Sequence, residues 1–332
     1  MATAAQTTGL QGRLELWASW GRRAIAHLGR SRTIALALAL VVGLVSAGCD
    51  PTRFAQASAD VPRLVLSVLS DPKTFNPILS QESPNIFGFT FAGLTTTDGI
   101  TGETVPALAE SWEISDDGTI LVFTLRDGLR WSDGEPLTVD DVIFTYDVLF
   151  NPDIPTNSRD GFRIGTEGRF PQVSRLDERR VQFTLPEPFA PMLGNTSLDI
   201  IPAHILRSAV EGTDAQGSPQ FLSTWGTDTP PRQIVGNGPF RLAQYVPGER
   251  LIFERNPYYW KQDDQGNAQP YIEQIVWQIV GSTDTAFFQF RSGGLDLESV
   301  QPDFFSLLKR EEERGNFTIY NGGPGLGTNF FA

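Results

Sequence analysis

The chain is poor in the side chains that most often carry catalysis or bind metal. Its 332 residues include one cysteine, Cys49, and two histidines, His27 and His204. One cysteine cannot build a disulfide framework, and a zinc site of cysteine and histidine lacks ligands. A Ser-His-Asp triad would need His204, which lies in the apolar run 200–206 and is therefore predicted to be structural. We expect no catalytic residue, no metal site and no cofactor.

Basic residues are also few. The chain has 26 Lys and Arg against 39 Asp and Glu, a net charge of −13. Residues 49–332 hold 21 bases and 38 acids, so this part alone carries −17. Such a surface repels nucleic acid and anionic lipid headgroups, and no basic stripe offsets the repulsion. We therefore expect no nucleic-acid partner.

The N-terminal apolar run is too short to span a bilayer. Thr33–Val45, TIALALALVVGLV, has 13 residues, whereas a spanning helix needs about 20. Five arginines and one acid occupy the first 48 residues. A positively charged start followed by an apolar run of this length is typical of a secretory signal peptide, which we assign to residues 1–48.

Small residues lead from this run into the only cysteine. Ser46-Ala47-Gly48-Cys49 resembles a lipobox, the motif in which the cysteine is diacylated and becomes the mature N-terminus, although the usual residue three before the cysteine is Leu. We therefore expect lipidation of Cys49, with the polar segment 49–60 as a lipidated tether between membrane and fold. The alternative is that Cys49 is an ordinary residue of a cleaved or anchoring segment.

The stretch 106–150 predicts a hairpin followed by a helix. Asp116-Asp117-Gly118 is a turn whose glycine can adopt positive φ, and residues 119–126 are β-branched or aromatic. Thr138 precedes Asp141 by three residues, a spacing like that of a capping box, and apolar residues follow at helical spacing. Further strands are predicted at 63–69, 270–277 and 317–320, hairpins at 173–185 and 240–255, and helices at 283–291 and 303–314.

The residue identities in this stretch are more informative about function than its periodicity. ALAESWEISDDG, TLRDG and WSDGEPLTVDDVIFTYD closely resemble the signature of the bacterial extracellular solute-binding proteins of family 5. These are the oligopeptide-, dipeptide- and nickel-binding components of ABC importers. A second block, from Val235 through ERNPYYW to Trp260, also resembles the family, with Asn237 in place of Thr and Phe240 in place of Tyr.

The resemblance implies an α/β fold of the periplasmic binding protein-like class, type II, with mixed sheets and flanking helices. Lobes I and II are expected to be present and lobe III to be missing, because family members run some 200 residues further. The implied division is lobe I at 61–91 and 191–326, lobe II at 92–190, and the start of a truncated lobe III at 327–332.

The resemblance also places candidate solute contacts. The loop after the first strand borders the ligand in such proteins, which suggests Ser80, Gln81, Glu82 and Ser83; a polar loop that only caps the next helix is the alternative. Backbone at Asn237 and Gly238 could face the solute, or the glycine could serve strand packing alone. The last candidates, Asn329, Phe330 and Phe331, lie where a strand pairing with a peptide would begin.

The implied function is that of a lipid-anchored, extracytoplasmic solute-binding subunit of an ABC importer. It would be a monomer that closes its lobes around a peptide or similar solute and docks to the permease and ATPase complex. One alternative is a truncated remnant that binds nothing tightly. Another is a secreted hydrolase using Asp116/Asp117 or Asp140/Asp141, but turn and cap chemistry explains both pairs.

Overall fold

The computed structural model describes residues 62–81 and 84–320. The predicted signal peptide and tether, with Cys49, lie outside the described residues. So do Glu82, Ser83 and the segment 321–332, which contains Asn329, Phe330 and Phe331.

The first sheet joins the beginning of the described chain to its later part. Strand β1 (Arg63–Val68) pairs in parallel with β10 (Gln274–Ile279), whereas β9 (Arg250–Arg255) and β8 (Phe240–Val246) continue the sheet antiparallel. The sheet is therefore mixed, as predicted. Gly248, at φ +70°, turns the β8–β9 hairpin at the expected position.

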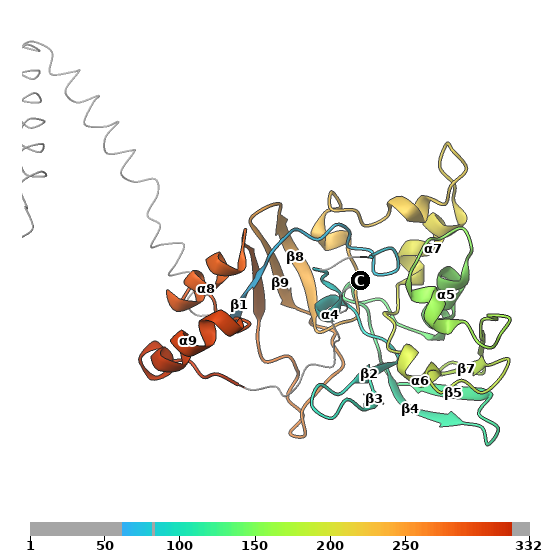
Figure 1. Ribbon diagram of the computed structural model, residues 1–332. Coiled ribbons are helices and arrows are strands. Elements are labelled where there is room, and N and C mark those ends of the chain that lie inside the picture. The colour runs from blue at the N-terminus through green and yellow to red at the C-terminus, as the bar shows by residue number, and fades with distance from the viewer. Residues whose placement is uncertain (1–61, 82–83, 321–332) are drawn as a thin grey trace, which may run out of the picture. The chain divides into compact units, whose positions relative to one another are not determined.

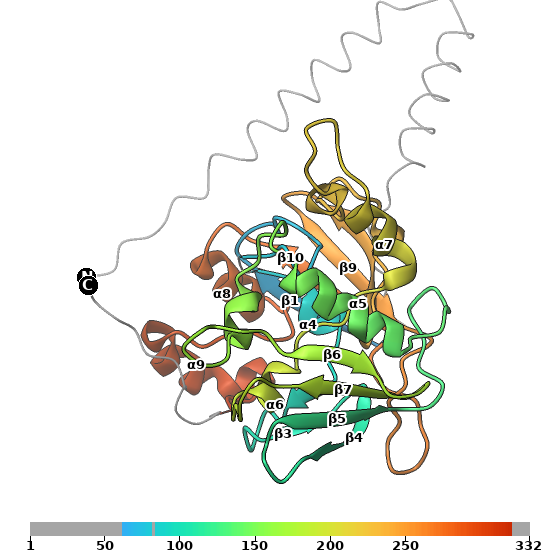
Figure 2. The same ribbon diagram turned by 90° about the vertical axis from the view of Figure 1, so that its right-hand side faces the viewer.

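The second sheet is antiparallel throughout. Its order is β4 (Ala109–Ile114), β5 (Ile120–Leu125), β7 (Arg180–Thr184) and β6 (Gln172–Arg175), built from the two hairpins predicted in this region (Figure 2). Gly118 closes the first hairpin at φ +68°, a conformation that glycine adopts at little cost. A short pair, β2 (Thr95–Thr97) and β3 (Thr104–Pro106), precedes this sheet.

Helix α5 (Val139–Phe150) begins with the predicted capping box. The Thr138 side chain accepts from the Asp140 N–H, and the Asp141 carboxylate accepts from the Thr138 N–H at 2.8 Å. These bonds satisfy backbone donors that the first helical turn leaves unpaired. The helix therefore starts at a position that its own sequence determines.

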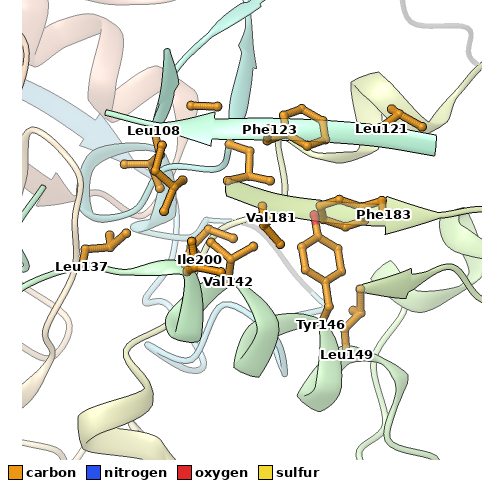
Figure 3. Close-up of a cluster of buried hydrophobic side chains, with 14 of the residues drawn as sticks. Leu108, Leu121, Phe123, Leu137, Val142, Tyr146, Leu149, Val181, Phe183 and Ile200 are labelled. Atoms are coloured by element: carbon orange, nitrogen blue, oxygen red, sulfur yellow. The ribbon is translucent and has the colours of Figure 1, made fainter. Parts of the chain in front are cut away.

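The described residues hold two large apolar clusters, and α5 contributes to both. On one face Tyr146 points to Phe183 of β7, with ring centroids 4.8 Å apart and an interplanar angle of 85° (Figure 3). On another face Phe144 and Val148 join the cluster under the first sheet, which includes Phe253. Burial of each such side chain contributes about 1.5–3 kcal/mol. The shared helix thus links the two sheets.

The remaining helices flank the sheets, as predicted. Helices α8 and α9 lie to one side of the first sheet, and α5 and α7 lie to the other (Figure 1). Their bounds are α4 Phe87–Thr90, α6 Met192–Asn195, α7 Ala203–Glu211, α8 Thr283–Arg291 and α9 Pro302–Gly315, with 3-10 turns η1 Ser158–Phe162, η2 Gln220–Ser223 and η3 Pro231–Gln233.

Two predicted strands differ in the structure. The strand predicted at 317–320 is wrong: the segment is irregular, and the Ile319 N–H donates to the Glu312 carboxylate rather than to a neighbouring strand. The strand predicted at 270–277 begins later in the structure and spans Gln274–Ile279. Its partner β1 begins at Arg63, opposite Gln274, because the preceding Pro62 has no N–H to donate to the ladder.

Candidate functional site

Three chain segments surround a hollow of about 640 Å³. The first is the predicted ligand loop, the second is the η1 turn, and the third follows α6. The predicted contacts Ser80 and Gln81 both line this hollow. We call it the polar hollow, because eight of its fourteen described lining residues have polar side chains: Ser80, Gln81, Asn85, Asn157, Ser158, Asn195, Ser197 and Asp199.

A buried asparagine fixes the loop that carries Ser80 and Gln81. The Asn76 side chain is fully buried, accepts from the Ile78 N–H at 3.0 Å and donates to Thr224 Oγ1 at 3.0 Å. The Asn76 carbonyl accepts from the Ser80 N–H at 3.1 Å. A buried amide without hydrogen-bond partners costs free energy, so the loop is most stable in the conformation that keeps these bonds to Asn76.

The two other walls are tied to one another. The Asn195 side-chain amide donates to the Gly161 carbonyl at 2.7 Å, which joins α6 to η1. Phe162 in η1 packs its ring on Tyr146 of α5, with centroids 5.6 Å apart. The walls are therefore continuous with the apolar core.

Helix α5 also positions the segment that contains Asp199. The Ile201 N–H donates to Thr145 Oγ1 at 3.0 Å, and the Ala203 N–H donates to Asp141 Oδ1 at 2.9 Å. Just before them, the Ile200 N–H donates to the Ala92 carbonyl at 3.1 Å. The backbone donors on the C-terminal side of Asp199 are thus fixed, and Asp199 itself lines the hollow.

Asp199 is the one titratable side chain among the described residues of this lining. It is partly exposed, and the lining of the hollow also includes the apolar residues Phe87, Phe162 and Leu198. Burial raises the pKa of Asp199 to about 7, because a carboxylate loses solvation there. Its side chain makes no hydrogen bond or ion pair with another described residue.

Asp199 was missed from sequence. It stands in the apolar run 198–206, and a single acid in such a run is the signal that could have revealed a carboxylate placed against the core.

Asn237 and Gly238 lie elsewhere, against α4. Asn237 is 2% exposed, and its side-chain amide accepts from the Ala92 N–H at 2.7 Å and donates to the Ala92 carbonyl at 3.3 Å. The Gly238 N–H donates to the Thr90 carbonyl at 2.9 Å, and a Cβ at Gly238 would lie 2.6 Å from Thr90 C. Close backbone packing thus accounts for the glycine. Neither residue lines the polar hollow, and solute binding by their backbone stays a prediction.

The two acidic pairs have local roles. Asp117 Oδ1 accepts from Ser115 and Thr119 inside the β4–β5 turn, which lowers the pKa of Asp117. Asp141 caps helices, and Asp140 pairs with Arg175 on the surface.

His204 Nε2 lies 2.9 Å from Asp133 Oδ2 at a partly exposed position. None of these side chains lines the polar hollow.

The described part of the chain contains no cluster of three or more His, Cys, Asp and Glu side chains that could hold a metal ion. Within the same residues, no helix has the length and apolar character needed to cross a membrane.

Residues 103–332 match the family described as "Bacterial extracellular solute-binding proteins, family 5 Middle". The chain belongs to this family. The resemblance drawn from the signature stretch is therefore confirmed.

Two curated relatives of this family 5 protein show how much of the length it spans. It is 34% identical over 236 residues to a "Probable ABC transporter-binding protein" of Deinococcus radiodurans, covering 70% of this chain and 39% of that protein. It is 30% identical over 272 residues to the "Periplasmic oligopeptide-binding protein OppA" of Salmonella typhimurium, covering 76% and 46%. The chain thus spans less than half the length of either relative.

Solved structures confirm the predicted fold class. The structure of NikZ from Campylobacter jejuni in complex with Ni(L-His) has a TM-score of 0.63 at 23% identity, covering 76% of this chain and 46% of that chain. Likeness at this identity shows the fold, which is the periplasmic binding protein-like α/β class of family 5.

Proposed function

We propose that the chain is the solute-capturing component of an ABC importer, working on the outer side of the membrane, and that its solute is a peptide or peptide-like molecule. Membership of family 5 supports the importer role. The peptide class is supported by 30% identity to a relative named as oligopeptide-binding. Delivery would take place by docking to the permease and its ATPase.

One observation carries the proposal: the loop that the resemblance assigned to the solute borders the polar hollow. The Gln81 and Asn157 side chains make no hydrogen bond with other described residues, so each can donate and accept toward a bound molecule. A peptide backbone presents alternating donors and acceptors that such amides match. A volume of about 640 Å³ is in the range of small-molecule sites.

Capture would follow from a shift between open and closed arrangements of the lobes. A solute that contacts two lobes binds the closed arrangement more tightly and therefore increases its population. The polar hollow would supply one set of these contacts. Closure, a monomeric state and the lobe boundaries at 91/92 and 190/191 belong to this proposal.

Gln81→Ala tests the role of the hollow. The full chain is titrated with trialanine at millimolar concentration and followed by the NMR shifts of its backbone amides. We expect shifts in residues 78–81, 85–87, 157–162 and 194–199, with an affinity about fivefold lower in Gln81→Ala, because one hydrogen bond contributes about 1 kcal/mol. Gln244→Ala is the matched control, since Gln244 is exposed on β8 and does not line the hollow.

Two results would argue against the proposal. Shifts confined to other surfaces would mean that the hollow is not the site. Equal loss of affinity in Gln81→Ala and Gln244→Ala would mean that Gln81 has no specific contact with the peptide.

A further inference from the structure

The polar hollow has an unbalanced charge. Its described lining includes amides, hydroxyls, apolar side chains and the carboxylate of Asp199, and no Lys, Arg or His is among these residues. When Asp199 is ionised, the charge carried by this described lining is negative, which favours a positive group over a neutral or negative one. The amides and hydroxyls nearby can complete the hydrogen bonding of that group.

Burial alone accounts for the raised pKa of Asp199, with no contribution from a neighbouring charged group. On η1, Arg159 donates to the Asn151 and Ile154 carbonyls, and Asp160 pairs with Arg163 at 2.8 Å. Helices α4 and α6 contain no titratable residue. Asp199 thus keeps its binding capacity for a molecule that enters the hollow.

We propose that the Asp199 carboxylate is the ion partner of an alkylammonium or guanidinium group on the bound solute. The inference rests on the proposed function and adds a class of solute to it: peptides with a basic side chain. A cation within about 4–6 Å favours the ionised carboxylate, so binding would lower the pKa of Asp199 from about 7 and offset its lost solvation.

An organic cation fits better than a metal ion. A divalent cation generally needs several charged or strongly coordinating ligands. The described residues contain no cluster of three or more His, Cys, Asp or Glu side chains that could hold a metal ion, and Asp199 is the one carboxylate among the described residues of this lining. A single carboxylate surrounded by several amide acceptors instead matches one ammonium group, which carries a single positive charge and three hydrogen-bond donors.

The test compares two blocked tripeptides on the full chain at pH 8: N-acetyl-Ala-Lys-Ala-amide and N-acetyl-Ala-Gln-Ala-amide. NMR titration is expected to give at least tenfold tighter binding of the lysine peptide. Asp199→Asn should remove this preference, and Asp116→Asn should keep it, because Asp116 is an exposed turn residue outside the hollow. Equal affinities for the two peptides in the native chain would overturn the charge assignment but leave the proposed peptide function standing.

A second measurement separates the site from the peptide function. The carboxyl carbon of Asp199 is followed through a pH titration with and without n-propylammonium, and with calcium chloride as the metal control. We expect n-propylammonium to move the titration to lower pH and calcium not to do so. If n-propylammonium lowers the titration pH but no tripeptide binds, the cation site stands and the proposed peptide function is wrong. If n-propylammonium leaves the titration unchanged, or calcium shifts it further, the proposed cation site is wrong.

Discussion

At the residue scale, Asp199 couples the stability of the fold to pH. Burial raises the pKa of Asp199 from an ordinary value of 3.8 to about 7. Between these values the folded state binds more protons than the unfolded state, so the contribution of this group to stability falls as pH rises from about 4 to about 7. Above that range the folded chain holds a poorly solvated charge.

Asp199→Asn is therefore expected to stabilise the chain at pH 8 relative to pH 4. A shift of this size corresponds to about 4 kcal/mol at most, and contact of the side chain with water reduces it, so we expect about 1–2 kcal/mol. Urea unfolding at pH 4, 6 and 8 measures the difference between variant and native chain. Asp116→Asn is the control; a stability difference for Asp199→Asn that does not change with pH would contradict the prediction.

The residues around Asp199 also show what one sequence could not predict. Ser80 and Gln81 were placed beside a solute by resemblance, and they do line the hollow. The opposite walls come from residues far along the chain, so no local pattern could join them. The backbone at Asn237 and Gly238 was also placed beside a solute by resemblance, and this stays a prediction; the Asn237 side chain itself is hydrogen-bonded to Ala92, a tertiary contact that no local pattern shows.

At the scale of elements, one buried carboxylate organises two helices. Asp141 Oδ2 accepts from the Thr138 N–H at the start of α5, and Asp141 Oδ1 accepts from the Ala203 N–H at the start of α7. Burial raises the pKa of Asp141, although these two hydrogen bonds lower it. The sequence predicted the first contact from the spacing 138–141, but the second depends on the tertiary fold.

Asp141→Ala is expected to lower the free energy of unfolding by about 2–3 kcal/mol, because it leaves the buried Ala203 N–H and the partly buried Thr138 N–H without their acceptor. Chemical denaturation monitored by circular dichroism measures the loss. Asp140→Ala is the matched control: Asp140 is exposed and pairs with Arg175 on the surface, so its loss should cost less than about 1 kcal/mol. Similar losses in the two variants would show that the second cap is not important for stability.

Elements with a local signal were predicted well, and elements without one were not. Gly118 and Gly248 determine hairpins through their own φ, and α8 occupies the predicted 283–291. The parallel pairing of β1 with β10 joins distant segments, which no hairpin pattern reveals. The predicted strand at 317–320 had the right composition, but its described neighbour is the Glu312 carboxylate rather than a strand.

At the scale of the whole molecule, the lobes and the membrane anchor remain predictions. The two sheets are drawn from the segments assigned to lobes I and II, but α5 packs in both apolar clusters. The chain matches its family over residues 103–332, so the resemblance extends well beyond the signature stretch. Residues 1–49, which carry the predicted signal peptide and lipidation site, precede the match.

Cys49→Ser tests how the molecule is held at the membrane. If Cys49 is diacylated, each buried CH₂ of two acyl chains contributes about 0.8 kcal/mol, which is enough for stable anchoring without a spanning helix. The full chain, expressed in a bacterium, should then be found in the membrane fraction and incorporate labelled palmitate, and Cys49→Ser should move it to the soluble fraction. Ser46→Leu is the matched control, because it supplies the usual lipobox residue and should leave anchoring intact. Membrane retention of Cys49→Ser would instead assign anchoring to the uncleaved apolar run 33–45, and the lipoprotein proposal would be wrong.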